Sequence, residues 1–251
     1  SENKEDNSAI DNIRFRLTDP SINIDDNINS SRYELKNINM VIFKKNKDIK
    51  LFTTFTHNSL GEVIHIASDF TFINNNISGK IYSQGVNINL EKPINFIKNI
   101  GISANKVNYI FWADILNNRI TDVKGNFNIL KTRLLNKITK SSIVLDNFSS
   151  NIFYDHKENI DNISLNKLSF KTHNNNYNNN QLILTMNEKA LSDVSLDRLY
   201  ISDFKKILNL LTIDTQRVVK RSLSVFESGL LSNIILRNLD DKKSLKYKLS
   251  F

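Results

Sequence analysis

Hydrophobic residues recur at every second position along most of this 251-residue chain. Near the start, Ile13, Phe15 and Leu17 alternate with Arg14 and Arg16. Strict alternation of this kind places one face of a β-strand against a dry surface and the other in water. The same period returns at 38–42, 49–55, 64–72, 86–90, 107–113, 123–129, 182–186 and 245–251. The chain is therefore expected to be mainly β.

Turn-forming residues separate these runs. Asn46–Asp48, Asn74–Asn76 and Asn117–Asn118 each lie between two alternating segments. Asn tolerates the left-handed backbone of tight hairpins, and connections this short do not accommodate parallel crossovers. An antiparallel meander is therefore predicted. The Asn-rich run 174–180 is predicted to be a loop.

Three short helices are expected, around 93–100, 203–211 and 215–228. Pro93 suits the first position of a helix that ends at Gly101. Ser202 or Asp203 is expected to cap the second helix, which has apolar residues on one face. The third is amphipathic and ends at Gly229.

Composition excludes several classes of protein. The absence of Cys removes disulfides, thiolate metal sites and cysteine nucleophiles. The net charge of +8 favours nucleic-acid or anionic-membrane binding, which would show a steep salt dependence. However, the chain has 39 Asn and 33 Ile, and Lys outnumbers Arg by 25 to 9. Because these residues have AT-rich codons and the cations are scattered, we attribute the charge to genome composition and expect no nucleic-acid partner.

The sequence carries no pattern typical of an enzyme. None of the four His residues has the spacing of a helical metal site, and His65 falls on the polar face of a strand. Asp155 and His156 fall in a predicted turn, which disfavours a catalytic dyad. Nucleophile-elbow and phosphate-binding loops are absent from the sequence. We therefore expect no catalytic residue, no metal and no cofactor.

The apolar face of the predicted strands has two interpretations from pattern alone. It is either the closed core of a β-sandwich, or of a sheet packed on two helices, or it lines an open groove filled by an apolar ligand. A large apolar face left bare would promote aggregation.

We expect either a soluble protein or a segment excised from a longer chain, and the sequence favours the segment. The chain begins with Ser1, its first residues are polar, and no stretch approaches the roughly 18 apolar residues of a membrane span. We expect a flexible start at 1–12 and a single β-rich domain at 13–251, forming part of a longer chain.

Several short motifs occur in an order similar to that of one known family. A Leu60-Gly61 pair before a strand is followed by a strand at 78–82, a Trp-containing strand at 111–114 with a hairpin behind it, and a late Gly229-Leu230 turn. This order resembles the central periplasmic region of YhdP-type members of the AsmA-like family, which also includes TamB. The resemblance covers roughly 13–251. Glu227 stands where the family usually has Pro, so the last turn departs from the pattern.

The resemblance implies a long curled antiparallel sheet with an apolar groove. It also implies a periplasmic segment of a protein anchored in the inner membrane of a Gram-negative bacterium through a segment outside this chain. Such proteins are thought to guide phospholipid acyl chains toward the outer membrane, without enzymatic activity. The candidate groove residues are Ile64, Ile66, Phe70, Phe72, Ile81, Val107, Tyr109, Phe111, Phe127 and Ile129.

The sequence does not show which side of each strand would face such a groove. The alternative function is a β-sandwich module that binds another envelope protein through an exposed edge strand.

Overall fold

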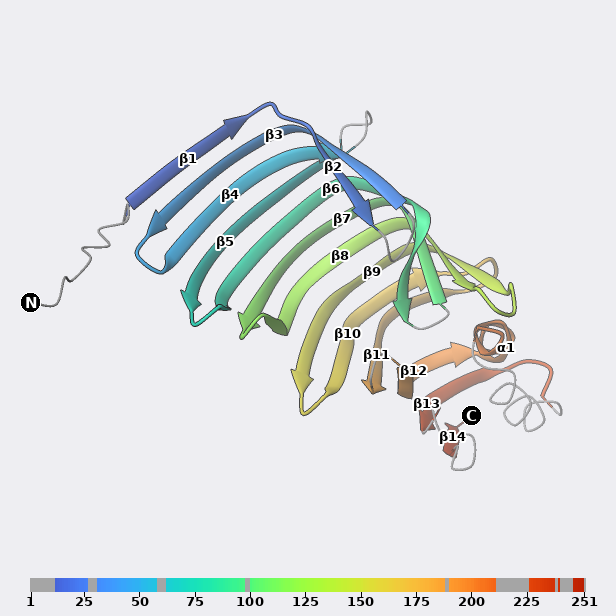
Figure 1. The fold of residues 1–251 in the computed structure, drawn as a ribbon. Coiled ribbons are helices and arrows are strands. Elements are labelled where there is room, and N and C mark those ends of the chain that lie inside the picture. The colour runs from blue at the N-terminus through green and yellow to red at the C-terminus, as the bar shows by residue number, and fades with distance from the viewer. Residues whose placement is uncertain are drawn as a thin grey trace, which may run out of the picture.

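A computed structural model describes residues 12–26, 31–57, 62–97, 100–187, 190–210, 226–237, 239 and 246–250. Strands make up almost all of the described chain, as predicted, and they form one antiparallel sheet rather than two (Figure 1). Residues 1–11 of the expected flexible start lie outside the described residues, and Asn12 already belongs to the first strand. The elements are β1 Asn12–Thr18, β2 Ile22–Asp26, β3 Ser31–Lys45, β4 Asp48–His57, β5 Val63–Ile73, β6 Asn76–Ile97, β7 Ile100–Leu116, β8 Arg119–Asn136, β9 Ser142–Lys157, β10 Ile160–Lys171, β11 Asn176–Asn187, β12 Ala190–Tyr200, α1 Ile201–Leu208, β13 Leu230–Arg237 and β14 Lys246–Ser250.

The topology is a meander. From β3 to β14 each strand pairs with the next one in sequence, while β1 and β2 both pair with β3. The turns Asn74–Asn75, Asn117–Asn118 and Glu158–Asn159 place both central residues at positive φ. This backbone matches the right-handed twist of the flanking strands, which is why Asn is favoured there. The predicted antiparallel meander is confirmed.

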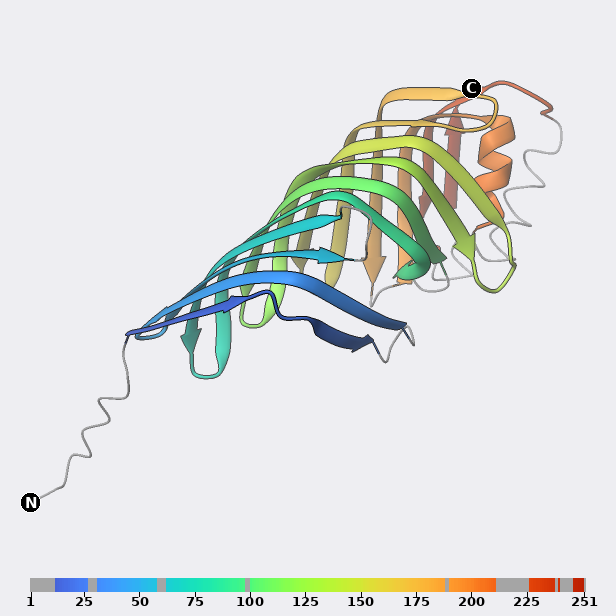
Figure 2. The same cartoon turned by 90° about the horizontal axis from the view of Figure 1, so that it is seen from above.

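A line of β-bulges crosses the middle of the sheet. Asn37, Asn87, Lys106, Asn147 and Lys167 have φ between 50° and 55°, and each lies inside a strand rather than in a turn. The pairing register shifts beside Asn37, Asn87 and Lys167. Because a bulge bends its strand and increases the local twist, the aligned bulges curl the sheet (Figure 2).

The curl distinguishes the two faces of the sheet. At the bend of β7, Ala104 and Val107 are buried while Asn105 and Lys106 between them are exposed. β8 repeats the arrangement, with Thr132 buried and Lys131 exposed. We call the face of Ala104, Val107 and Thr132 the inner face, and the opposite one the outer face. Side chains on the inside of a corner are the ones that become buried, so the inner face is the concave one.

Of the three expected helices, the first is absent, the second is present, and most of the third lies outside the described residues. The segment 93–100 is not helical, because β6 continues to Ile97 and β7 begins at Ile100. Pro93 falls where the register of β6 with β7 shifts, between Leu90 and Ile94. Because the regular hydrogen-bond ladder is interrupted there, the strand tolerates a residue without an N–H.

The helix expected at 203–211 is α1, which begins two residues earlier and ends at Leu208. Its N-cap residue is Tyr200, without a side-chain capping bond, so the expected cap at Ser202 or Asp203 was wrong. Most of the helix expected at 215–228 lies outside the described residues, and 226–228 are not helical.

The Asn-rich run 174–180 is not simply a loop, because β11 begins at Asn176. Tyr177 and Asn180 are both buried in this strand. A buried aromatic ring and cross-strand pairing to β10 outweigh the low strand propensity of Asn.

Candidate functional site

The strand register places all ten candidate groove residues on the inner face. Tyr109 of β7 lies opposite Gly85 and Phe127, and Gly85 lies opposite Ile64. Paired residues of neighbouring strands point to the same face, and so do residues two apart on one strand. The same reasoning extends to the remaining members, namely Ile66, Phe70, Phe72, Ile81, Val107, Phe111 and Ile129.

Two glycines make room for aromatic rings at the centre of this face. A Cβ added to Gly85 would lie 2.2 Å from the ring of Tyr109, and one added to Gly125 would lie 2.5 Å from the ring of Phe111. The two rings stack on each other with centroids 4.8 Å apart. The rings therefore lie over the glycines, and the hydroxyl of Tyr109 is 3.2 Å from Ser83 Oγ.

This central part of the inner face is only partly covered. Of the ten candidates, Val107 is buried, Phe72 is 39% exposed, and the other eight are half-buried. Val107 belongs to a small cluster with Ile88 and Ala104, against which half-buried neighbours pack. Apolar surface thus remains available over β4–β8.

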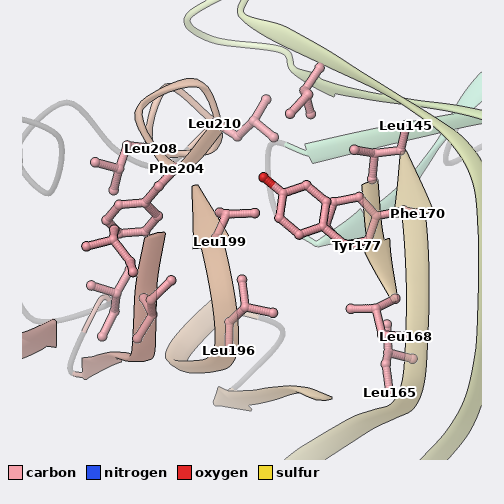
Figure 3. Packing of buried hydrophobic residues seen from close by; sticks show 14 of the residues in the cluster. Leu145, Leu165, Leu168, Phe170, Tyr177, Leu196, Leu199, Phe204, Leu208 and Leu210 are labelled. Carbon is pink, nitrogen blue, oxygen red and sulfur yellow. The ribbon is translucent and has the colours of Figure 1, made fainter. Parts of the chain in front are cut away.

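The inner face is filled by the protein itself at its C-terminal end. Leu199, Ile201, Leu208 and Leu231 are completely buried there (Figure 3). They belong to a continuous cluster built by β9–β13 and α1. Figure 3 shows Phe204 and Leu208 of α1 on one side of Leu199, with Tyr177 and Phe170 on its other side. The helix therefore closes this end of the concave face.

A buried carboxylate fastens α1 to the sheet. Asp203 Oδ2 accepts hydrogen bonds from Thr172 Oγ1 at 2.7 Å, Asn175 Nδ2 at 2.8 Å and the Tyr177 hydroxyl at 2.7 Å. Burial acts to raise the pKa of Asp203, but these hydrogen bonds and Lys206 lower it overall. Burial and the bond to Asp203 raise the pKa of Tyr177. Both groups therefore keep their ordinary charge at neutral pH.

A polar cluster lies on the inner face of β9 and β10, near the hairpin. Asp161 Oδ1 accepts a hydrogen bond from the Tyr154 hydroxyl at 2.8 Å and is 2.7 Å from His156 Nδ1. Burial and the neighbouring carboxylates raise the pKa of Tyr154 to about 12. The predicted turn at Asp155 and His156 is wrong, because β9 continues to Lys157. As neighbours on a strand, these two side chains point to opposite faces and form no dyad.

Inner-face residues on both sides of the ten candidates were not predicted from the sequence. Leu51 and Phe55 of β4 lie opposite Ser68 and Ile64, and Ile152 of β9 lies opposite Gly125. Leu51 and Phe55 belong to the alternating run 49–55, so the period-two signal was present for them, whereas Ile152 is followed directly by Phe153 and Tyr154 and shows no alternation. The sequence pattern does not give the pairing register, which determines which side chains of neighbouring strands point to the same face.

Among the described residues, no three His, Asp or Glu side chains gather in a way suited to a metal ion. None of the helical segments in the described part of the chain has the length and apolarity that crossing a bilayer requires. His65 is exposed on the outer face, as predicted, and lies 3.0 Å from Thr54 Oγ1.

No protein-family model, curated protein or solved structure matches this chain significantly.

Proposed function

We propose that this chain is a non-enzymatic segment of a lipid-transport bridge that guides phospholipid acyl chains along the inner face of its curled sheet. One observation carries the proposal. The inner face is apolar and concave across β4–β8, and most of its side chains there are only half-buried. A ligand with a long apolar portion would complete the burial that the protein leaves unfinished.

An acyl chain suits this surface chemically. It forms no directional bonds, so a wall needs only continuous apolar contact and paired backbone groups, both of which a hydrogen-bonded sheet supplies. Each methylene transferred from water contributes about 0.8 kcal/mol. The five strands β4–β8 span about 20 Å between outer members, at about 4.8 Å per spacing. Movement from one strand to the next would exchange similar contacts.

The resemblance of the motif order to the AsmA-like family supports the same function. In that setting the lipid headgroup stays in water, outside the groove, while the tails lie on the inner face. The expected location is the periplasm, between inner and outer membrane.

The filled C-terminal end limits the route. Completely buried side chains such as Leu199 and Leu231 fill the space between α1 and β12–β13. The acyl chain is therefore proposed to occupy β4–β8, and its passage beyond β9 would require either exit along the open side of the sheet or displacement of α1.

Native mass spectrometry of protein purified from bacterial membranes and periplasm tests this function. A bound phospholipid is expected, and Phe111→Asp on the inner face should remove it. Phe153→Asp is the matched control, because Phe153 is 48% exposed on the outer face of the neighbouring region. Retention of lipid by Phe111→Asp, or equal loss in both variants, would contradict the proposal.

A bare protein in the same experiment favours the second candidate, a module that binds an envelope protein through an edge strand. The observation behind it is that the sheet is open, with β1 and β14 at the two ends of the strand order. Unpaired edge strands offer backbone donors and acceptors to a partner strand.

A further inference from the structure

The outer face carries a straight row of aromatic side chains. The register places Phe52 of β4, Tyr82 of β6, Trp112 of β7 and Phe153 of β9 in one line across the strands. Ala67 lies between the first two, and the last pair is separated by a lysine on β8. The rings of Tyr82 and Trp112 have centroids 5.6 Å apart. The row spans five strand spacings, or about 24 Å.

Three of the four rings are exposed to solvent, and Tyr82 is half-buried. Phe52 is 50% exposed, Trp112 44% and Phe153 48%. The hydrophobic cluster that encloses the C-terminal core lies on the opposite face, with α1 packed against it. Exposed aromatic rings gathered in one place, rather than scattered, are typical of recognition surfaces.

The row borders a shallow hollow of about 600 Å³. Its floor is the backbone of β5–β9 between two rows of outer-face side chains, the aromatic row and a charged row that includes Asp69, Lys80 and Asp114. Ala67 leaves the floor open beside the rings of Phe52 and Tyr82. The hollow is therefore bounded by flat apolar rings on one side and by polar groups on the other.

The charged row carries both signs: Asp69 and Lys80 are cross-strand neighbours on β5 and β6, and the carboxylates Asp114, Asp122 and Asp155 follow on β7, β8 and β9. Lys50 Nζ is 3.2 Å from Asp69, Lys80 Nζ is 3.8 Å from Asp114, and Lys157 Nζ is 3.0 Å from Asp155. The hollow also includes Asp122 and Lys124, which carry opposite charges. Four Asp and two Lys line the hollow, so hydrogen-bond donors and acceptors are both present, acceptors predominate, and a polyanion is disfavoured.

We propose that this aromatic row and hollow bind a neutral oligosaccharide, specifically an extended β-1,4-linked glycan lying across the strands. A pyranose ring has an apolar face of C–H groups that stacks on aromatic rings, and its hydroxyls both donate and accept hydrogen bonds. The rings of Tyr82 and Trp112 are tilted by 56° to each other, so each offers its own face to one pyranose ring. The Asp and Lys side chains of the charged row provide partners for hydroxyls. The site lies on the face opposite to the proposed lipid groove, so it does not depend on that function.

Fluorescence titration tests the proposal directly, because Trp112 is the single Trp of the chain. The probes are cellohexaose and chitohexaose, with dextran as a non-β-1,4 control. A saturable change of Trp112 emission with at least one hexasaccharide, and none with dextran, is expected.

Single substitutions test whether binding depends on the aromatic row. Tyr82→Ala and Phe153→Ala should each weaken binding about fivefold or more, as expected for residues central to an interface. Phe43→Ala is the matched control, because Phe43 is exposed on the same face but lies under Arg14, outside the hollow. It should bind like the unmodified protein.

Trp112→Ala is followed by calorimetry, since it has no fluorescent reporter, and it should abolish measurable binding. No saturable response to either hexasaccharide overturns the proposal and leaves a protein partner as the occupant of this face. Equal weakening by Phe43→Ala and Tyr82→Ala would overturn it as well.

Discussion

At the scale of single residues, Asp203 links α1 to the sheet. Its Oδ2 accepts three hydrogen bonds, and the side chain is fully buried. Asp203→Asn preserves the volume but replaces a charged acceptor, so the free energy of unfolding in urea should fall by about 1–3 kcal/mol. Asp69→Asn is the control, because Asp69 forms an exposed ion pair with Lys50. Its effect should stay within about 0.5 kcal/mol. Equal effects of the two changes would show that Asp203 is not a special anchor.

The same residue predicts a pH dependence. The pKa of Asp203 is lowered in the folded protein, whereas the unfolded value lies near 4. A carboxyl with a lowered pKa contributes stability above its unfolded pKa, and this contribution is lost as the pH falls through the folded value. The free energy of unfolding, measured in urea at pH 6 and pH 3, should therefore drop further in the unmodified protein than in Asp203→Asn. Parallel losses would contradict the assignment.

At the scale of elements, the bulges decide the shape of the sheet. Asn147 in β9 has φ 51° and an exposed side chain. Because a β-branched residue is strained in the left-handed region, Asn147→Val should lower the free energy of unfolding by about 1–2 kcal/mol, whereas Asn147→Gly should change it little. Asn128→Val in β8 is the control, because Asn128 is exposed on a strand without positive φ. Urea unfolding of the three variants provides the measurement. A similar cost for both Val substitutions would contradict a backbone role for Asn147.

These elements also show what the sequence could predict and what it could not. Alternation and Asn-rich turns were enough for the strands and the meander, because both signals are local. The helix predicted to begin at Pro93 was wrong, because a proline is compatible both with the start of a helix and with an irregular strand. The bulges were missed because Asn37, Asn87 and Asn147 stood among 39 Asn, most of which were attributed to genome composition. Eleven of the sixteen non-glycine residues with positive φ are Asn, so part of that Asn content has a structural use.

At the scale of the whole molecule, the inner face divides into a filled end and an open part. The ten candidate residues were selected from the period of each strand, and their common face emerged only from the register, which depends on the turns and bulges together. The helix that closes the C-terminal end was expected as an element. Its anchoring through Asp203 was not, because Thr172, Asn175 and Tyr177 lie 26 or more residues away in sequence.

This division predicts a gradient of local stability, measurable by hydrogen exchange with mass spectrometry. Backbone amides of β9–β13 and α1 should exchange slowest, because they enclose the large buried cluster. Those of β1, β2 and β14 should exchange fastest, because among the described residues each pairs with a single neighbouring strand. The strands β4–β8 should lie between, since the buried cluster beneath them has only three members. Adding phospholipid in detergent micelles should slow exchange in β4–β8 more than in β9–β13, where the large buried cluster already covers much of the inner face. Detergent alone is the control, and uniform protection along the sheet, with or without lipid, would contradict a half-open inner face.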